Sequence, residues 1–468
     1  MSGVICLSGW DEARIEKLLP WVRAQKDRFI VVLETSSLFL LKKVLFPEVD
    51  VYVFNKENQR EVFEGIALKY IFLPFSYEGD SSVLDVFIRI QTEVSYRVAD
   101  CADQGVQAFR NIRHNLKTDF CRADELFGKF KGVPAIICGA GPSLRKNGHL
   151  LKSVGDKALL IAGGGATQAL KKLGVEPHFE AHVDPSSAHT FVPTNNPTFF
   201  QLRTDAKAVD GASGPKLLMG GSGNFPLEKW LEERLGMPSL PFDGGWTVGT
   251  FCAALAYQLG CNPIIFVGMD FAASQEHTYA AGVQGGGTTK RSPITNKQGD
   301  VLFAQVDWIF AAEWLENFAG EHKDTTWINA TEGGRGFTGV QDKSLQDVLA
   351  SLGPQEDFNR MGYKTVPTGD LLETFESSLI RSFEVVDCLF KEIERIYPSS
   401  PQENGTCALL EQELSEEIAY QTLLLPIWDV WKGILLRHNQ DGEAGLFLHE
   451  ILFYKNLQPQ LFSACTLK

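Results

Sequence analysis

The chain has 468 residues, of which 44% are hydrophobic and 22% are charged, and this composition excludes a disordered or fibrous protein. Its 44 lysines and arginines and 58 aspartates and glutamates leave a net charge of −14, which makes it a poor general binder of nucleic acids or anionic membranes. The nine cysteines are scattered without a CxxC pair, which argues against a disulfide framework and a structural zinc site.

The N-terminal sequence MSGVICLSGWDEARIEK lacks the basic start and long apolar stretch of a signal peptide. No apolar run approaches the roughly 20 residues that a membrane span needs. We therefore expect a cytoplasmic protein with no membrane span and no nucleic-acid partner. The sequence leaves the oligomeric state open.

The first 85 residues alternate short apolar runs with amphipathic segments. This alternation predicts a small α/β domain over residues 1–85, followed by a helical connector over 86–132. Helical spacing is found at 11–25 and 37–46. The candidate strands are VICLSG (4–9), FIVVLE (29–34), DVYVFN (50–55) and YIFLPF (70–75).

A second α/β pattern covers residues 133–342 and predicts a Rossmann-like, mostly parallel sheet. Residues 343–468 are helical and acidic, typical of a helical domain. Ligands of open parallel sheets bind at the carboxyl ends of the strands, so we expect the site in the central domain. Its candidate strands are 135–139, 158–163, 179–184, 199–204, 216–221, 263–268 and 325–330.

The sharpest motif is the run AIICGAGPSL, in which an apolar strand leads into Gly139, Gly141, Pro142 and Ser143. Such glycines let the backbone approach a phosphate at the start of a helix. The alternative is a tight strand–helix turn that binds nothing. The motif is not an ordinary dinucleotide site, because Leu144 stands where GxGxxG requires its third glycine. No GxxxxGK[ST] motif of P-loop enzymes occurs.

Further polar segments follow other candidate strands. The GGGATQ run predicts either a wall for a nucleotide base or sugar, or a sterically tight crossover. Asp184 could bind a ribose hydroxyl, a metal or an amine, or could cap a helix. Thr247 is a candidate helix cap, and NATEGGR offers hydroxyl, carboxylate and main-chain groups together. The candidate binding residues in these segments are Gly164, Thr167, Gln168, Thr331, Glu332 and Gly333.

Asp270 and His277 follow another strand and lead into a glycine-rich stretch, 282–300, that contains Lys290, Arg291 and Lys297. This composition predicts a mobile loop whose cations could close over a phosphate. His277 suits general acid–base chemistry near neutral pH, although a lone histidine is more often structural. His178 and His182 share one face of a strand, but a metal site would need a third ligand, so the metal ligands stay unknown.

Four segments, in order, resemble a known family: PAIICGAGPSL, VEPHFEAHVDP, VGTFCAALAYQLGCNPIIFVGMDFA and INATEGG. They look like the core domain that bacterial motility accessory factors (Maf) share with 6-hydroxymethylpterin diphosphokinase (MptE-like) proteins, with a sialyltransferase-like sheet. The resemblance covers about 133–340 and implies a nucleotide-dependent transferase. Maf proteins are similar in plan, with an α/β domain before the core and helices after it.

The Maf resemblance implies a glycosyltransferase that moves a nonulosonic sugar from a CMP-activated donor to serine or threonine of a protein such as flagellin. This reaction requires no cofactor, and its candidate bases are His277, Asp184 and Asp270. The MptE resemblance implies transfer of diphosphate from ATP to a pterin, with Asp184 and Asp270 as Mg²⁺ ligands. We weigh the glycosyltransferase above the diphosphokinase, because a minimal pterin kinase does not need added terminal domains.

The resemblance also assigns nucleotide contacts. Gly139, Gly141, Pro142 and Ser143 match the turn that contacts the phosphate, and Gly164, Thr167 and Gln168 take the place of further nucleotide contacts. The sequence departs from the family at GGGAT and at HTYA, where Lys-Thr-His-Ala is expected. These departures leave a third hypothesis open, a scaffold or nucleotide-binding protein without catalysis.

Overall fold

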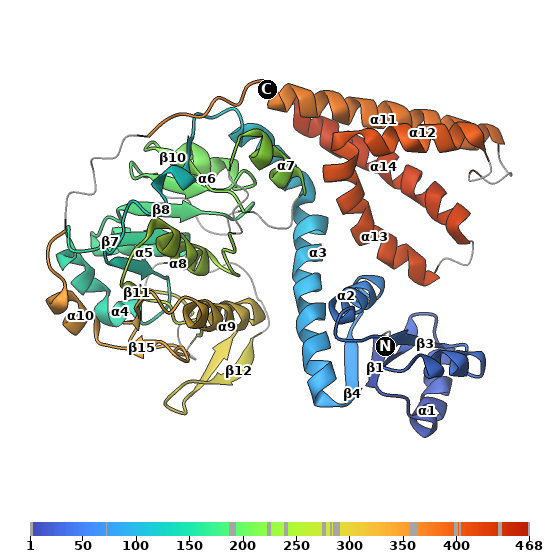
Figure 1. Ribbon diagram of the computed structural model, residues 1–468, viewed down its shortest axis with the longest axis horizontal. Coiled ribbons are helices and arrows are strands. Elements are labelled where there is room, and N and C mark those ends of the chain that lie inside the picture. Colours follow the sequence, from blue (N-terminus) through green and yellow to red (C-terminus); the bar gives the residue numbers. More distant parts are fainter. Residues whose placement is uncertain are drawn as a thin grey trace. The chain divides into compact units, whose positions relative to one another are not determined.

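The computed structural model describes residues 3–71, 73–186, 193–221, 226–237, 242–273, 278–280, 283, 291–355, 363–396, 401, 404–438 and 442–466. Contacts divide the chain into two compact units (Figure 1). The first comprises Met1–Val106 and Phe375–Lys468, and the second comprises Gln107–Thr374. This division does not follow the boundaries predicted after residues 85, 132 and 342.

A parallel sheet of four strands, in the order β3-β2-β1-β4, begins the first unit. Three predicted strands are confirmed, but the fourth is wrong. Tyr70 and Ile71 are buried in the core directly after a helix, and the strand begins only at Phe75. The elements are β1 (Gly3–Ser8), α1 (Glu12–Arg23), β2 (Arg28–Glu34), η1 (Ser37–Val44), β3 (Val49–Val53), α2 (Gln59–Lys69) and β4 (Phe75–Gly79).

The C-terminal helices belong to this first unit because they share its core. Val430 lies in the same buried cluster as Val4 and Phe63. Most of residues 371–466 is helical, as predicted, and so is the first part of the predicted connector 86–132, but this connector also contains the strand Cys121–Arg122. No helix in the described ranges is long and apolar enough to cross a membrane. The helices are α3 (Ser81–Asn115), α11 (Leu371–Ile396), α12 (Gly405–Glu416), η5 (Tyr420–Leu424), α13 (Leu425–His438) and α14 (Gly442–Thr466).

A nine-stranded sheet organises the second unit, in the order β15-β14-β11-β6-β7-β8-β9-β10-β5. All its paired strands run parallel, which confirms the predicted Rossmann-like, mostly parallel core. The strands are β5 (Cys121–Arg122), β6 (Ala135–Cys138), β7 (Leu159–Gly163), β8 (Phe179–His182), β9 (Thr198–Phe200), β10 (Lys216–Leu218), β11 (Ile264–Val267), β14 (Trp327–Asn329) and β15 (Gln341–Asp342).

Each predicted central strand matches one of these elements. The two outermost strands, β5 and β15, were not predicted, because each has only two residues and leaves no apolar run in the sequence. A separate antiparallel pair, β12 (Ser292–Thr295) and β13 (Val301–Ala304), gives the end of the predicted mobile loop 282–300 a regular structure. The remaining short helices are η2 (Ala123–Leu126), α4 (Leu144–Asn147), η3 (Gly148–Ser153), α6 (Ala206–Gly211) and α7 (Pro226–Arg234).

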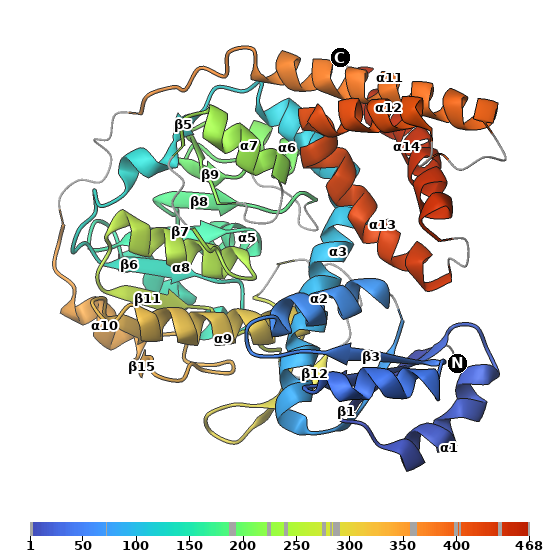
Figure 2. The ribbon, with the colours of Figure 1, turned by 45° about the vertical axis from the view of Figure 1, so that its right-hand side comes forward.

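Helices cover both faces of the large sheet (Figure 2). In β6, Ile137 packs with α8 (Val248–Leu259) and α9 (Val306–Glu321), whereas Ile136 packs with α5 (Gly165–Leu173) and α10 (Leu345–Ser351). Successive residues of a strand point to opposite faces, so a strand buried on both sides is apolar throughout. This burial explains why β6, β7 and β11 were easy to predict.

The strand order also fixes where a ligand can bind. The chain leaves β6 toward β7 on one side and leaves β11 toward β14 on the other, although β6 and β11 are neighbours. Such a reversal opens a crevice beyond the carboxyl ends of the two strands. The turns after Cys138 and Val267 therefore flank the expected site.

Candidate functional site

The glycines of the turn after β6 allow it to pack against the turn after β11. A Cβ atom on Gly139 would lie 2.4 Å from the carbonyl oxygen of Gly268, and one on Gly141 would lie 1.9 Å from Oδ2 of Asp270. The Gly139 amide donates to the carbonyl of Val267 at 2.8 Å, and the Gly141 amide donates to that of Gly268 at 2.8 Å. These two amides serve the tight turn rather than a phosphate.

Asp270 is the buried acid at the centre of this turn, with 4% of its surface exposed. The Ser143 hydroxyl donates to its Oδ2 at 2.6 Å, and the Ser143 amide donates to its Oδ1 at 3.2 Å. Burial raises the pKa of Asp270 to about 6, whereas the two Ser143 bonds and the charge of Lys146 act to lower it. The carboxyl is therefore mostly ionised at neutral pH, and it takes up a proton at a slightly lower pH.

Replacing Ser143 by alanine is expected to raise the pKa of Asp270 further, by about one unit, because the ionised carboxylate loses its hydroxyl donor. A carboxyl whose folded pKa lies above its unfolded pKa lowers the free energy of unfolding as pH rises between the two values. In S143A, the free energy of unfolding should therefore keep falling as the pH rises above 6. Denaturation followed from pH 4 to 8 measures it. Ser153→Ala, which removes a hydroxyl bonded to the Leu150 carbonyl, should keep the wild-type profile.

The NATEGGR segment, which begins with the last residue of β14, also packs against Asp270 and the turn that contains it. A Cβ atom on Gly334, whose φ is +71°, would lie 2.4 Å from the Asp270 Cα atom. Thr331 is fully buried, and its hydroxyl accepts the Met269 amide. The Glu332 carboxylate accepts from the Asn147 side chain at 2.7 Å and from the Leu345 amide at 3.1 Å. Thr331 and Glu332 thus hold the turns together.

The GGGAT turn after β7 is likewise tightly packed. A Cβ atom on Gly163 would lie 2.1 Å from Cγ1 of Val248, and Gly164 has a φ of +53° at the start of α5. The Thr167 hydroxyl donates to the Gly164 carbonyl at 2.8 Å. Neither Thr167 nor Gln168 is among the described residues that line the cavities below. Thr247 caps α8 through a capping box with Thr250, as predicted.

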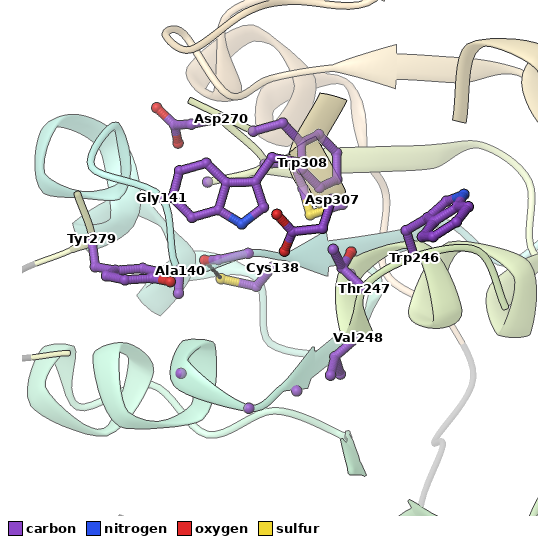
Figure 3. A pocket seen from close by; sticks show the side chains of 18 of the residues that line it. Cys138, Ala140, Gly141, Trp246, Thr247, Val248, Asp270, Tyr279, Asp307 and Trp308 are labelled. Carbon is purple, nitrogen blue, oxygen red and sulfur yellow. Dashed lines mark hydrogen bonds between the residues drawn. The ribbon is translucent and has the colours of Figure 1, made fainter. Parts of the chain in front are cut away.

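A cavity of about 280 Å³ occupies the crevice (Figure 3). Asp184 and Asp270 both line it, together with Gly139, Gly141 and Gly164. A second cavity of about 820 Å³ is lined by Pro142, Ser143, Glu332 and Gly333. Asp270 contributes to both walls. His277 and Lys290 lie outside the described residues.

Comparisons with known proteins agree with this architecture. Residues 107–276 match the family model described as 6-hydroxymethylpterin diphosphokinase MptE-like. The chain carries an MptE-like domain. Its fold is similar to the structure of a MAf glycosyltransferase from Magnetospirillum magneticum AMB-1, with a TM-score of 0.55 and 12% sequence identity over 99% of this chain and 79% of that chain. No curated protein sequence matches this chain.

The histidines of the MptE-like domain that were weighed as metal ligands have other contacts. Nδ1 of His178 accepts the Leu160 amide at 2.9 Å, and burial lowers the pKa of this histidine. His182 lies 3.7 Å from the Glu180 carboxylate. Within the described ranges, no three His, Cys, Asp or Glu side chains are grouped so that they could hold a metal ion.

Several residues of the smaller cavity were missed by the sequence analysis. Asp307 and Trp308, at the start of α9, line it beside Tyr279 and Trp246. Figure 3 shows Tyr279 and Trp246 at opposite ends, with Asp307 and Trp308 between them. The apolar residues of the segment AQVDWIFAAEW recur with helical spacing, so a packed helix explains them without a binding site. The signal overlooked was an aspartate followed by a tryptophan at the start of a helix.

Proposed function

We propose that this protein is a glycosyltransferase that moves a nonulosonic sugar from a CMP-activated donor to a serine or threonine hydroxyl of a protein such as flagellin. The observation that carries the proposal is Asp270, a buried acid with a raised pKa that lines two cavities at the sheet's switch point. The likeness in fold to a MAf glycosyltransferase, which covers 99% of this chain, supports it.

In the proposed reaction, Asp270 is the general base. Its carboxylate accepts the proton of the acceptor hydroxyl while the hydroxyl oxygen forms a bond to the anomeric carbon of the sugar. The bond from that carbon to the phosphate oxygen breaks, and CMP leaves with the electron pair. Ser143 positions the carboxylate through its two hydrogen bonds. Asp184 also lines the smaller cavity but is exposed, so we assign the role of the base to the buried Asp270.

The leaving phosphate needs hydrogen-bond donors or cations. The glycine turn does not offer its amides for this purpose, because those of Gly139, Gly141 and Ser143 donate to protein oxygens. Arg145 and Lys146 line the larger cavity, which Asp270 also lines. The charge of Lys146 acts on the pKa of Asp270, so its ammonium group is within electrostatic range of the reacting centre. We assign Arg145 and Lys146 to the phosphate.

A diphosphokinase is the second candidate, because the matching family model is described by that activity. Its Mg²⁺ would require converging carboxylates. The described residues contain no group of three His, Cys, Asp or Glu side chains that could hold a metal ion. This part of the chain therefore does not fit the ion, and we derive no step through it.

A thermal-shift panel of CMP, CDP, CTP, ATP and GTP, each with and without Mg²⁺, tests the proposed function. CMP without Mg²⁺ should raise the melting temperature of the wild type by mass action. Lys146→Met should reduce this shift, because one phosphate-binding cation is lost. Lys152→Met, which removes an exposed lysine from η3, should keep it.

The outcomes separate the three hypotheses. A shift caused by ATP only with Mg²⁺ would favour the diphosphokinase. A CMP shift without sugar transfer to any serine- or threonine-bearing acceptor would favour a non-catalytic nucleotide-binding protein. The absence of a shift with every nucleotide would reject both enzymes and leave a scaffold.

A further inference from the structure

The segment between β2 and β3 of the first unit exposes apolar side chains. It contains η1, a 3₁₀ helix of eight residues, whose turn of three residues places every third side chain on one line. Leu38, Leu41 and Val44 follow this spacing and expose 73%, 71% and 82% of their surface. Their sequence neighbours Leu40 and Leu45 expose 46% and 74%. We call these five residues the apolar ridge.

The apolar ridge is large enough to be part of an interface. Its side chains together expose on the order of 600 Å² of apolar surface, at the upper end for the largest apolar patch of a monomer. The other large apolar side chains that the structure describes as exposed each lie on a different helix or strand. A specific dimer takes about 800 Å² from each partner, with an apolar centre and a polar rim. The ridge would supply most of one half of such an interface.

Charged side chains at the margin of the apolar ridge are paired within the chain. Nζ of Lys42 lies 3.2 Å from the Glu12 carboxylate and 5.3 Å from the centre of the Trp10 ring. Glu48, just beyond the ridge, pairs with Arg23 at 2.6 Å. Because these charges already have partners, two copies of the ridge can meet without repulsion between them. An anionic bilayer is a poorer match, since the chain has a net charge of −14.

We infer that the protein forms a symmetric homodimer in which the apolar ridge of one chain packs against the ridge of a second copy. A two-fold interface uses the same surface of both chains, so a single apolar patch is enough to build it. Dimerisation removes the leucines of both chains from water, which is the driving force. The inference does not depend on the proposed function, because the ridge contains none of the residues assigned to sugar transfer.

The oligomeric state in solution tests the inference. Sedimentation equilibrium of the full chain over roughly a hundredfold range of concentration should reach twice the chain mass of 51.9 kDa at the upper end. Leu41→Glu places one carboxylate from each chain in the interface. We expect it to raise the dissociation constant of the dimer by at least about 100-fold. Val44→Lys introduces the opposite charge and should have the same effect, because both variants replace apolar surface.

The matched control is Leu409→Glu. Leu409 lies on α12, outside the apolar ridge, and is exposed to 70%, as Leu41 is to 71%. L409E should dimerise like the wild type, and circular dichroism checks that each variant is folded. A wild type that is monomeric at every concentration, or an L41E variant that dimerises as well as L409E, would overturn the inference. So would a monomer that binds phosphatidylserine vesicles and loses this binding in L41E, which would assign the ridge to a membrane surface.

Discussion

Replacing Asp270 by asparagine is expected to lower the rate of sugar transfer by about 10²–10⁴-fold, the usual contribution of a general base. Asparagine has nearly the same shape: its oxygen can accept from the Ser143 amide while its NH2 group donates to the Ser143 hydroxyl, so the turn should keep its structure. It cannot take the proton of the acceptor. Turnover of a CMP-sugar donor and an acceptor protein, followed by CMP release, measures the loss. Residual activity near the wild-type rate would exclude Asp270 as the base.

The same variant has a signature in stability that does not depend on knowing the substrates. Burial raises the folded pKa of Asp270 from 3.8 to about 6, so the folded state binds more protons between these values than the unfolded state. The free energy of unfolding of the wild type therefore falls as pH rises from about 4 to about 6. About two pKa units correspond to about 3 kcal/mol.

D270N lacks this titration. The stability of the variant relative to wild type should thus rise by about 3 kcal/mol across that range and stay level above it. Parallel urea titrations of the two proteins at pH 4, 5, 6 and 7 give the difference and cancel the titration of other groups. A difference that stays constant with pH would show that Asp270 has an ordinary pKa.

The second large effect concerns Gly141. A methyl group there would meet Oδ2 of Asp270 at 1.9 Å and the Gly268 carbonyl oxygen at 2.7 Å. The first contact is relieved only if the Asp270 side chain moves, and the second only if the backbone moves. We expect Gly141→Ala to lower the free energy of unfolding by about 3 kcal/mol, at the upper end of overpacking effects, and to abolish activity.

The matched control is Gly320→Ala in the last turn of α9. A Cβ atom on Gly320 would meet nothing within 4 Å, and alanine is the better helix former. The stability of G320A should equal that of the wild type or exceed it by up to about 1 kcal/mol. Chemical denaturation measures the free energy of unfolding of both variants and of the wild type. If G141A were as stable as G320A, the two turns could not pack as closely as described.

The strands of the second unit could be predicted because burial on both faces leaves continuous apolar runs bounded by glycine. The run YIFLPF shows the limit of this signal: Tyr70 and Ile71 are equally apolar, but they are buried at the end of α2. A short apolar run shows that a segment is buried. It does not distinguish a strand from a loop that enters the core.

The sequence analysis placed its candidate residues at the carboxyl ends of the strands, but it could not predict the contacts that these residues make. Gly139 and Gly141 are glycines because two turns meet there, and a phosphate-binding turn would require the same residues. Sequence alone could not separate these causes. Asp270 was identified by its position after a strand, whereas Asp307 joins it only through the strand order, which brings the start of α9 to the same crevice. Such proximity between distant residues leaves no local pattern.

The two shortest strands of the large sheet stand at its margins. β5 and β15 have two residues each, and Thr365 forms an isolated antiparallel bridge with Cys121 of β5. An open sheet edge exposes unpaired amides and carbonyls that can template the addition of a strand from another molecule. Because each edge strand has only two residues, it exposes few consecutive unpaired amides and carbonyls. The sheet is thereby protected against growing from one chain into the next, which is a safeguard against aggregation while the protein folds.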